Sequence, residues 1–259
     1  MKKIFILFLA CISLALTFKL GDGVIQDETG LFQSWFTSQY AVLTLDTYGS
    51  DNGGNNQSGS FSYTIGSGSN RILILGLTSE DSNDHYQTMN YVRYNSTNLT
   101  YLCTYYCDNG SETGWQVTHI YYMLEADLPT TGAYTLEYQY DITVNGHIEM
   151  AISFENAEQE APTYEGIAQT TGYNIISDSI TTTVDNSYII DWGNHASNDG
   201  DYTQNSGQSE LVDTDGNTTS GCMSYELKTS AGEETHQVTY SGTDNRHVLT
   251  LVGVKPKAL

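Results

Sequence analysis

Residues 61–77, FSYTIGSGSNRILILGL, carry the pattern that decides the fold. Residues 61–65 alternate between apolar and polar side chains, which is typical of a half-buried β-strand. A Gly/Ser/Asn cluster at 66–70 supplies a turn, and the apolar run 71–77 predicts a buried strand. Further along the chain no segment has sustained helical periodicity between capping residues. The sequence predicts an all-β protein, an antiparallel β-sandwich of the jelly-roll type behind an extended N-terminal segment.

The strand–turn–strand pattern also repeats at a distance. Two similar sheet halves packed face to face would produce such a repeat, and so would the ordinary succession of strands in a single sandwich. The matched positions are Tyr63–Ile65 with Thr182–Val184, 71–77 with 187–192, Tyr122–Leu124 with Tyr225–Leu227, Gly132 with Gly232, Tyr138 with Tyr240, and His147 with His247.

Composition excludes several classes of protein. The 259 residues include 9 Lys+Arg and 31 Asp+Glu, for a net charge of −22. Such a chain repels nucleic acid and anionic membranes, so we expect neither as a partner. Only 15% of residues are charged, which argues against a helical bundle or a coiled coil.

The N-terminus predicts export. Two lysines precede an uncharged apolar run at 4–16, which is too short to span a membrane and fits a signal peptide over residues 1–15. A lipoprotein acylated at Cys11 and a retained anchor are alternatives. We expect an extracellular or cell-surface protein with no membrane contact after cleavage.

Three regions follow the signal peptide. Residues 16–50 form an apolar extended segment, residues 51–60 a flexible Gly/Asn/Ser linker, and residues 61–256 the β-sandwich domain. The apolar segment either completes the sheet of its own chain or inserts into a neighbouring subunit as a donor strand.

Cysteines and sequons suggest covalent modifications. Cys103 and Cys107 are candidates for a small-loop disulfide, with two reduced thiols as the alternative, and Cys222 is then the odd cysteine. The candidate glycosylation sites are Asn56, Asn95, Asn98, Asn109 and Asn217.

The candidate ligand sites are few, and no catalytic constellation stands out. Trp192, Asn194 and His195 lie at a predicted strand end and suit sugar binding, with core packing as the alternative role for the tryptophan. Asp213, Asp215 and Asn217 offer oxygen ligands, so calcium is a possible ion and we expect no other cofactor. Paired carboxylates on one strand face, HExxH and GxSxG motifs are not found in the sequence, and we expect no enzyme.

Three segments resemble β-sandwich modules of the jelly-roll kind found in bacterial secreted proteins. They are SGSNRILILGL at 67–77, YVRYNSTNLTYL at 91–102, and SYELKTSAGEETHQVTYSGTDNRHVLTLVGVKP at 224–256. The resemblance covers residues 57–256 and implies a sandwich fold and export. Most such modules have no assigned activity, so it carries over no catalytic residue.

Together these features predict an exported structural protein that self-associates into a homo-oligomer, a fibre or a surface assembly through its N-terminal β-segment. A carbohydrate-binding or adhesin module, with glycans as partners, is the first alternative. A polysaccharide-degrading enzyme is the second.

Overall fold

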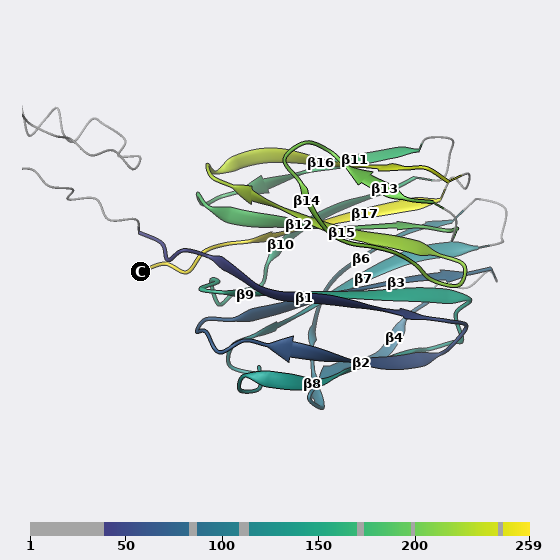
Figure 1. Ribbon diagram of the computed structural model, residues 1–259, viewed down its shortest axis with the longest axis horizontal. Coiled ribbons are helices and arrows are strands. Elements are labelled where there is room, and N and C mark those ends of the chain that lie inside the picture. Colours follow the sequence, from purple (N-terminus) through teal and green to yellow (C-terminus); the bar gives the residue numbers. More distant parts are fainter. Residues whose placement is uncertain (1–38, 83–86, 109–113, 170–173, 198–199, 243–245) are drawn as a thin grey trace, which may run out of the picture. The chain divides into compact units, whose positions relative to one another are not determined.

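A computed structural model describes residues 39–82, 87–108, 114–169, 174–197, 200–242 and 246–259. Within these ranges the protein is all-β and every strand pair is antiparallel, which confirms the predicted fold class. Residues 42–257 form one compact unit, which Figure 1 shows as stacked sheets. In the other unit Tyr40 pairs with Ala258 in an isolated bridge. The expected signal peptide and residues 16–38 lie outside the described ranges.

The first half of the compact unit is a sandwich of two sheets with jelly-roll strand order. Its five-stranded sheet runs β1 (Thr44–Gly53), β9 (Gly146–Glu155), β3 (Ile72–Asp81), β7 (Trp115–Leu124) and β6 (Thr100–Asp108). Its smaller sheet runs β2 (Ser58–Ile65), β8 (Gly132–Tyr140), β4 (Met89–Tyr94) and β5 (Thr97–Asn98). A core rich in Leu and Tyr fills the space between them.

The second half repeats this arrangement. Its five-stranded sheet runs β10 (Thr163–Gln169), β17 (His247–Val254), β12 (Ser187–His195), β15 (Ser220–Lys228) and β14 (Ser209–Asp215). Its smaller sheet runs β11 (Ile175–Thr182), β16 (Gly232–Tyr240) and β13 (Tyr202–Gln204). The region 61–256, predicted as one sandwich, therefore belongs to two consecutive sandwiches with the same strand order.

Strand pairing fixes the register of this internal repeat. His147 lies opposite Ser79 on β3, and His247 lies opposite His195 on the equivalent strand β12. The two histidines therefore occupy equivalent positions, as the sequence repeat predicted. Gly132 and Gly232 both start a strand with positive φ angles of 142° and 145°, a conformation that favours glycine. The predicted match of Tyr138 with Tyr240 is wrong by two residues, because counting from these glycines pairs Tyr140 with Tyr240. The same register matches Ile65 with Thr182, two residues away from the prediction.

The predicted boundaries near the N-terminus are also corrected. Residues 44–50 belong to β1, which pairs with β9 of its own chain, so this part of the expected donor segment completes its own sheet. The expected linker at 51–60 is instead the end of β1, a short connection and the start of β2.

The two five-stranded sheets pack against each other through a third core. Trp192 of β12 lies directly on Gly76 of β3, where an added Cβ would come within 2.3 Å of the indole. The indole Nε1 donates a 3.1 Å hydrogen bond to the carbonyl of Met150 in β9. Because both faces of β3 are covered, its residues 72–77 form a continuous apolar run without alternation, unlike a strand with one solvated face. The result is four layers of sheet with three cores between them.

Candidate functional site

The three residues predicted to bind sugar are buried. Trp192 and Asn194 lie at the interface between the sandwiches, and His195 points into the second sandwich, where its ring centroid is 3.5 Å from that of Tyr240. Trp192 and His195 have no exposed surface, and Asn194 is 1% exposed. Asn194 Nδ2 donates to the Val117 carbonyl at 3.1 Å and to Thr118 Oγ1 at 2.8 Å. The structure thus contradicts the predicted exposure of this group, because a covered indole offers no face to a sugar. The alternative role, core packing, is the one it has.

The three predicted calcium ligands point to different partners. Asp213 accepts a hydrogen bond from the Tyr202 backbone N–H, and Asn217 Nδ2 donates to the Asn145 carbonyl. Asp215 is exposed on β14. In the part of the chain that the structure describes, no group of three or more His, Cys, Asp or Glu side chains has the arrangement of a metal site.

The predicted disulfide is wrong. Cys103 is a free thiol and buried, and burial raises its pKa to about 12, so it stays protonated and unreactive at neutral pH. Cys107 lies on the same strand and is also buried. Cys222, the odd cysteine, is a fully buried free thiol of β15.

Four of the five sequons lie on exposed positions of the described chain. Asn56 is in the β1–β2 connection, Asn95 is in the turn between β4 and β5, Asn98 ends β5, and Asn217 lies in the β14–β15 turn. Asn109 lies outside the described residues. Exposure makes these four side chains accessible to glycosylation, which stays a prediction.

Each sandwich core also contains a buried polar cluster that the sequence did not reveal. In the first, His147 Nδ1 and Glu149 Oε1 are 2.6 Å apart, and the Tyr138 hydroxyl lies 3.3 Å from the same nitrogen. Burial raises the pKa of Glu149. His147 and Glu149 are at i and i+2 of β9, so they share the face toward the smaller sheet. The His-x-Glu spacing was the only available signal.

The cluster of the second sandwich centres on Asp191 of β12. Asp191 Oδ2 lies 2.7 Å from His236 Nδ1 and accepts hydrogen bonds from Ser224 Oγ at 2.6 Å and Gln208 Nε2 at 2.9 Å. His236 Nε2 faces Glu226 at 3.7 Å. The serine donates to the aspartate and not to the histidine, so the order of contacts differs from that of a nucleophilic triad. Asp191 and His236 are fully buried, which keeps both from a large substrate.

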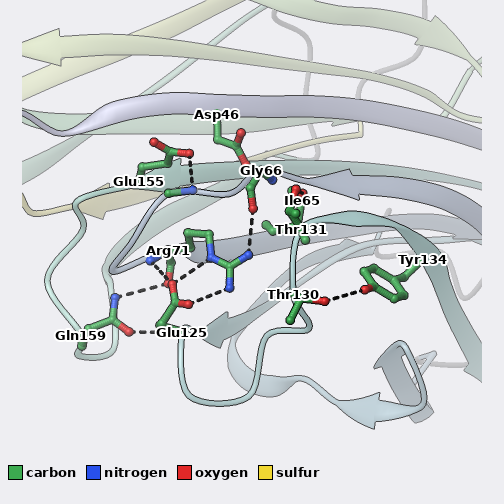
Figure 2. Close-up of polar contacts among 11 residues, drawn as sticks. Asp46, Ile65, Gly66, Arg71, Glu125, Thr130, Thr131, Tyr134, Glu155 and Gln159 are labelled. Carbon is green, nitrogen blue, oxygen red and sulfur yellow. Dashed lines mark hydrogen bonds and ion pairs between the residues drawn. The ribbon is translucent and has the colours of Figure 1, made fainter.

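A third polar cluster lies in the first sandwich where β3 begins and β7 ends (Figure 2). The Arg71 guanidinium makes a two-point ion pair with Glu125, with contacts of 2.9 and 2.6 Å, and donates to the Gly66 carbonyl. These hydrogen bonds lower the pKa of Glu125. Gln159, which follows the first sandwich, accepts from the Glu125 N–H and donates to the Arg71 carbonyl. With these polar groups paired among themselves, the cluster acts as a structural clamp.

The accessible feature that is best suited to an interaction is the edge strand β6. It is the outermost strand of the first five-stranded sheet, nine residues long, with the sequence TYLCTYYCD. Tyr101 is 55% exposed and Tyr106 is 48% exposed. The Tyr106 ring lies 5.2 Å from the Trp115 ring at 39°, and Tyr101 packs edge-on against Tyr121 at 5.6 Å. The outermost strand of this sheet and the start of its neighbour β7 thus carry an aromatic strip, defined here as Tyr101, Tyr106 and Trp115.

No protein-family model matches this chain, and a search of curated proteins finds no matching sequence. Among the described residues, no helix has the length and apolar character needed to cross a membrane.

Proposed function

We propose that this protein is an exported, non-catalytic structural subunit that joins further copies of itself into an extracellular assembly. The observation that carries the proposal is the open edge of β6. An edge strand presents unpaired N–H and C=O groups, and soluble proteins usually block such edges with charges, prolines or irregular backbone. A strand from a second copy satisfies the same groups by extending the sheet.

The four outer strands of the five-stranded sheets differ in this protection. β14 carries three acids in seven residues, Glu210, Asp213 and Asp215, together with a bulge. β1 carries Asp46 and Asp51 and is also bulged, and β10 carries Glu165 at its centre. β6 has a bulge near its start, but its only charged residue is the last one. In a chain with a net charge of −22, β6 therefore presents eight consecutive edge residues without a charge that would oppose pairing.

The occupant that we propose is the apolar part of the N-terminal segment of another copy, residues 16–38. This stretch includes LFQSWF at 31–36, which suits an added strand with alternate side chains in contact with the aromatic strip. Residues 44–50 are already paired within the chain, so the donor is confined to the residues before them.

A charge placed on the edge tests the proposal. Tyr106→Lys adds a positive charge to β6 without removing a buried contact of the cores, and we expect it to dissociate the assembly in sedimentation velocity experiments. Tyr164→Lys on β10 is the matched control, because Tyr164 is a tyrosine of similar exposure, 44%, on another outer strand. The control variant should sediment as the wild type does.

Either of two results would overturn the proposal. One is a wild-type protein that stays monomeric at every concentration. The other is equal dissociation of both lysine variants, which would mean that the effect follows net charge and not the β6 edge.

Further support comes from the burial of three titratable groups in the cores and from the small size of a hollow between the sandwiches. Asp191, His236 and Glu149 have no exposed surface. A hollow beside the connection between the sandwiches, lined by Ile72, Pro162 and Val254 among others, encloses about 10 Å³. That is room for about one water molecule, whereas small-molecule sites enclose hundreds of cubic ångströms.

Glycan binding is a second candidate, and the aromatic strip favours it over the buried Trp192. Exposed Tyr106 beside Trp115 offers ring faces of the kind on which sugars stack. Binding to a glycan array that Tyr106→Ala and Trp115→Ala abolish, with assembly intact, would support this function over the first.

A further inference from the structure

We propose that Gln116 and Thr219 form an intramolecular ester that cross-links the two sandwiches. Gln116 lies on β7 of the first sandwich, and Thr219 immediately precedes β15 of the second. Gln116 Nε2 is 2.7 Å from Thr219 Oγ1, and neither residue has any exposed surface. The carboxamide oxygen of Gln116 is buried and has no hydrogen-bond partner among the described residues. The Thr219 hydroxyl therefore contacts the Gln116 carboxamide, whose oxygen accepts no hydrogen bond from the described residues.

The turn that carries Thr219 is anchored to the first sandwich by the two residues that precede Thr219. Thr218 Oγ1 donates to Glu80 Oε2 at 2.8 Å, and Asn217 Nδ2 donates to the Asn145 carbonyl at 2.9 Å. Within the turn, the Gly216 N–H donates to the Thr219 carbonyl at 2.7 Å. Thr219 Oγ1 itself donates to the His195 carbonyl at 2.8 Å. Fixing two reacting groups in this way replaces a bimolecular encounter with an effectively unimolecular step.

The site also contains a proton carrier. Glu80 is directly opposite Gln116 in the β3–β7 register, on the face toward the second sandwich, and is 4% exposed. Burial raises the pKa of its carboxyl above the usual range, which favours the uptake of a proton by this group. Arg246 of the second sandwich lies 3.4 Å from its Oε1.

The reaction balances without any further reagent. Thr219 Oγ1 bonds to the carboxamide carbon of Gln116, and its hydroxyl proton passes to Glu80, directly or through the Thr218 hydroxyl. The bond from that carbon to Nε2 then breaks, the proton returns to the nitrogen, and ammonia leaves. The products are one ester and one ammonia molecule. Burial excludes the water that would hydrolyse the ester, while ammonia is protonated and diluted in bulk solvent.

Intact-mass spectrometry of the purified protein tests the proposal. We expect the folded wild type to weigh less than its processed sequence by the mass of one ammonia molecule. Thr219→Val should restore the full mass, and Thr219→Ser, which keeps a hydroxyl, should again lose ammonia. Thr214→Val on β14 of the same hairpin is the matched control and should lose ammonia as the wild type does. Glu80→Gln should slow the loss.

Peptide mapping locates the bond. A chymotryptic digest should contain one peptide pair joined through Gln116 and Thr219, which hydroxylamine separates. A folded wild-type protein at full mass, or an ammonia loss mapped to any other residue, overturns the proposal. The outcome is independent of assembly, because a monomer and a fibre subunit give the same covalent mass.

Discussion

The two sandwiches share their strand order but not the contents of their cores. Leu75 and Leu136 of the first sandwich correspond in register to Asp191 and His236 of the second. In the opposite direction, Glu149 corresponds to Leu249. The carboxylate of each buried polar cluster is therefore replaced by a leucine in the other sandwich, which folds with the same topology. The fold depends on strand patterning and on the shared interface, while each cluster is an addition specific to one half.

The interface that both halves share should give the largest effect. Gly76 and Trp192 occupy corresponding positions on β3 and β12, and the Trp192 indole fills the space that the absent side chain of Gly76 leaves. Trp192→Ala removes the largest fully buried side chain and its hydrogen bond, so we expect a loss of about 5 kcal/mol of unfolding free energy in urea titrations. A loss of under about 1 kcal/mol would mean that the sandwiches are stable without this contact.

Variants of the Asp191 cluster test whether its polar network is essential to the fold or can be replaced by apolar residues. Asp191→Leu alone leaves His236 buried without its partner, and we expect it to cost about 4 kcal/mol. The triple variant Asp191→Leu, Ser224→Ala, His236→Leu copies the leucines of the first sandwich, and its stability should lie within about 1 kcal/mol of the wild type. Equal losses in the single and triple variants would contradict the view that the cluster is replaceable.

Acid sensitivity should differ between the halves. Burial lowers the pKa of His119 to about 4, and the corresponding residue of the second sandwich is Cys222. Below the unfolded-state pKa of about 6.5, the unfolded chain binds a proton that the folded chain excludes, so stability falls from about pH 6.5 to pH 4. This single group accounts for about 3 kcal/mol over that window.

The matched variant is His119→Cys, which copies the second sandwich. The difference between wild type and variant, measured by chemical denaturation at several pH values, isolates this histidine from the many carboxylates. A difference that does not change between pH 7 and pH 4 would contradict the assigned burial.

The smallest expected loss of stability comes from replacing Gly132 or Gly232, and it should be the same in both sandwiches. Gly132 and Gly232 start equivalent strands with nearly the same positive φ, and an added Cβ meets no backbone atom within 4 Å at either position. Replacement by alanine should therefore cost about 1 kcal/mol at each site through backbone strain alone. Unequal thermal shifts for the two alanine variants would show that the turns are not equivalent.

Sequence patterning predicts the strands well but not the partners of buried polar residues. The apolar run at 71–77 and the alternation at 133–140 lie in β3 and β8, because burial on one or two faces leaves a local signature. By contrast, Asp191 and His236 are 45 residues apart and meet only through the stacking of two sheets. The sequence around Trp192 and Asn194 predicts an exposed strand end, because it does not show that the other sandwich covers these residues. The hydrogen bond from Gln116 Nε2 to Thr219 Oγ1 joins residues that are 103 positions apart and has no local signature.

Negative-stain electron microscopy of the processed chain, with and without residues 16–38, tests the proposed assembly most directly. The intact processed chain should form fibres or another ordered assembly, and the shortened chain, which keeps every described strand, should remain a folded monomer. A shortened chain that assembles as the intact chain does, or an intact chain that stays monomeric under all conditions, would contradict the account.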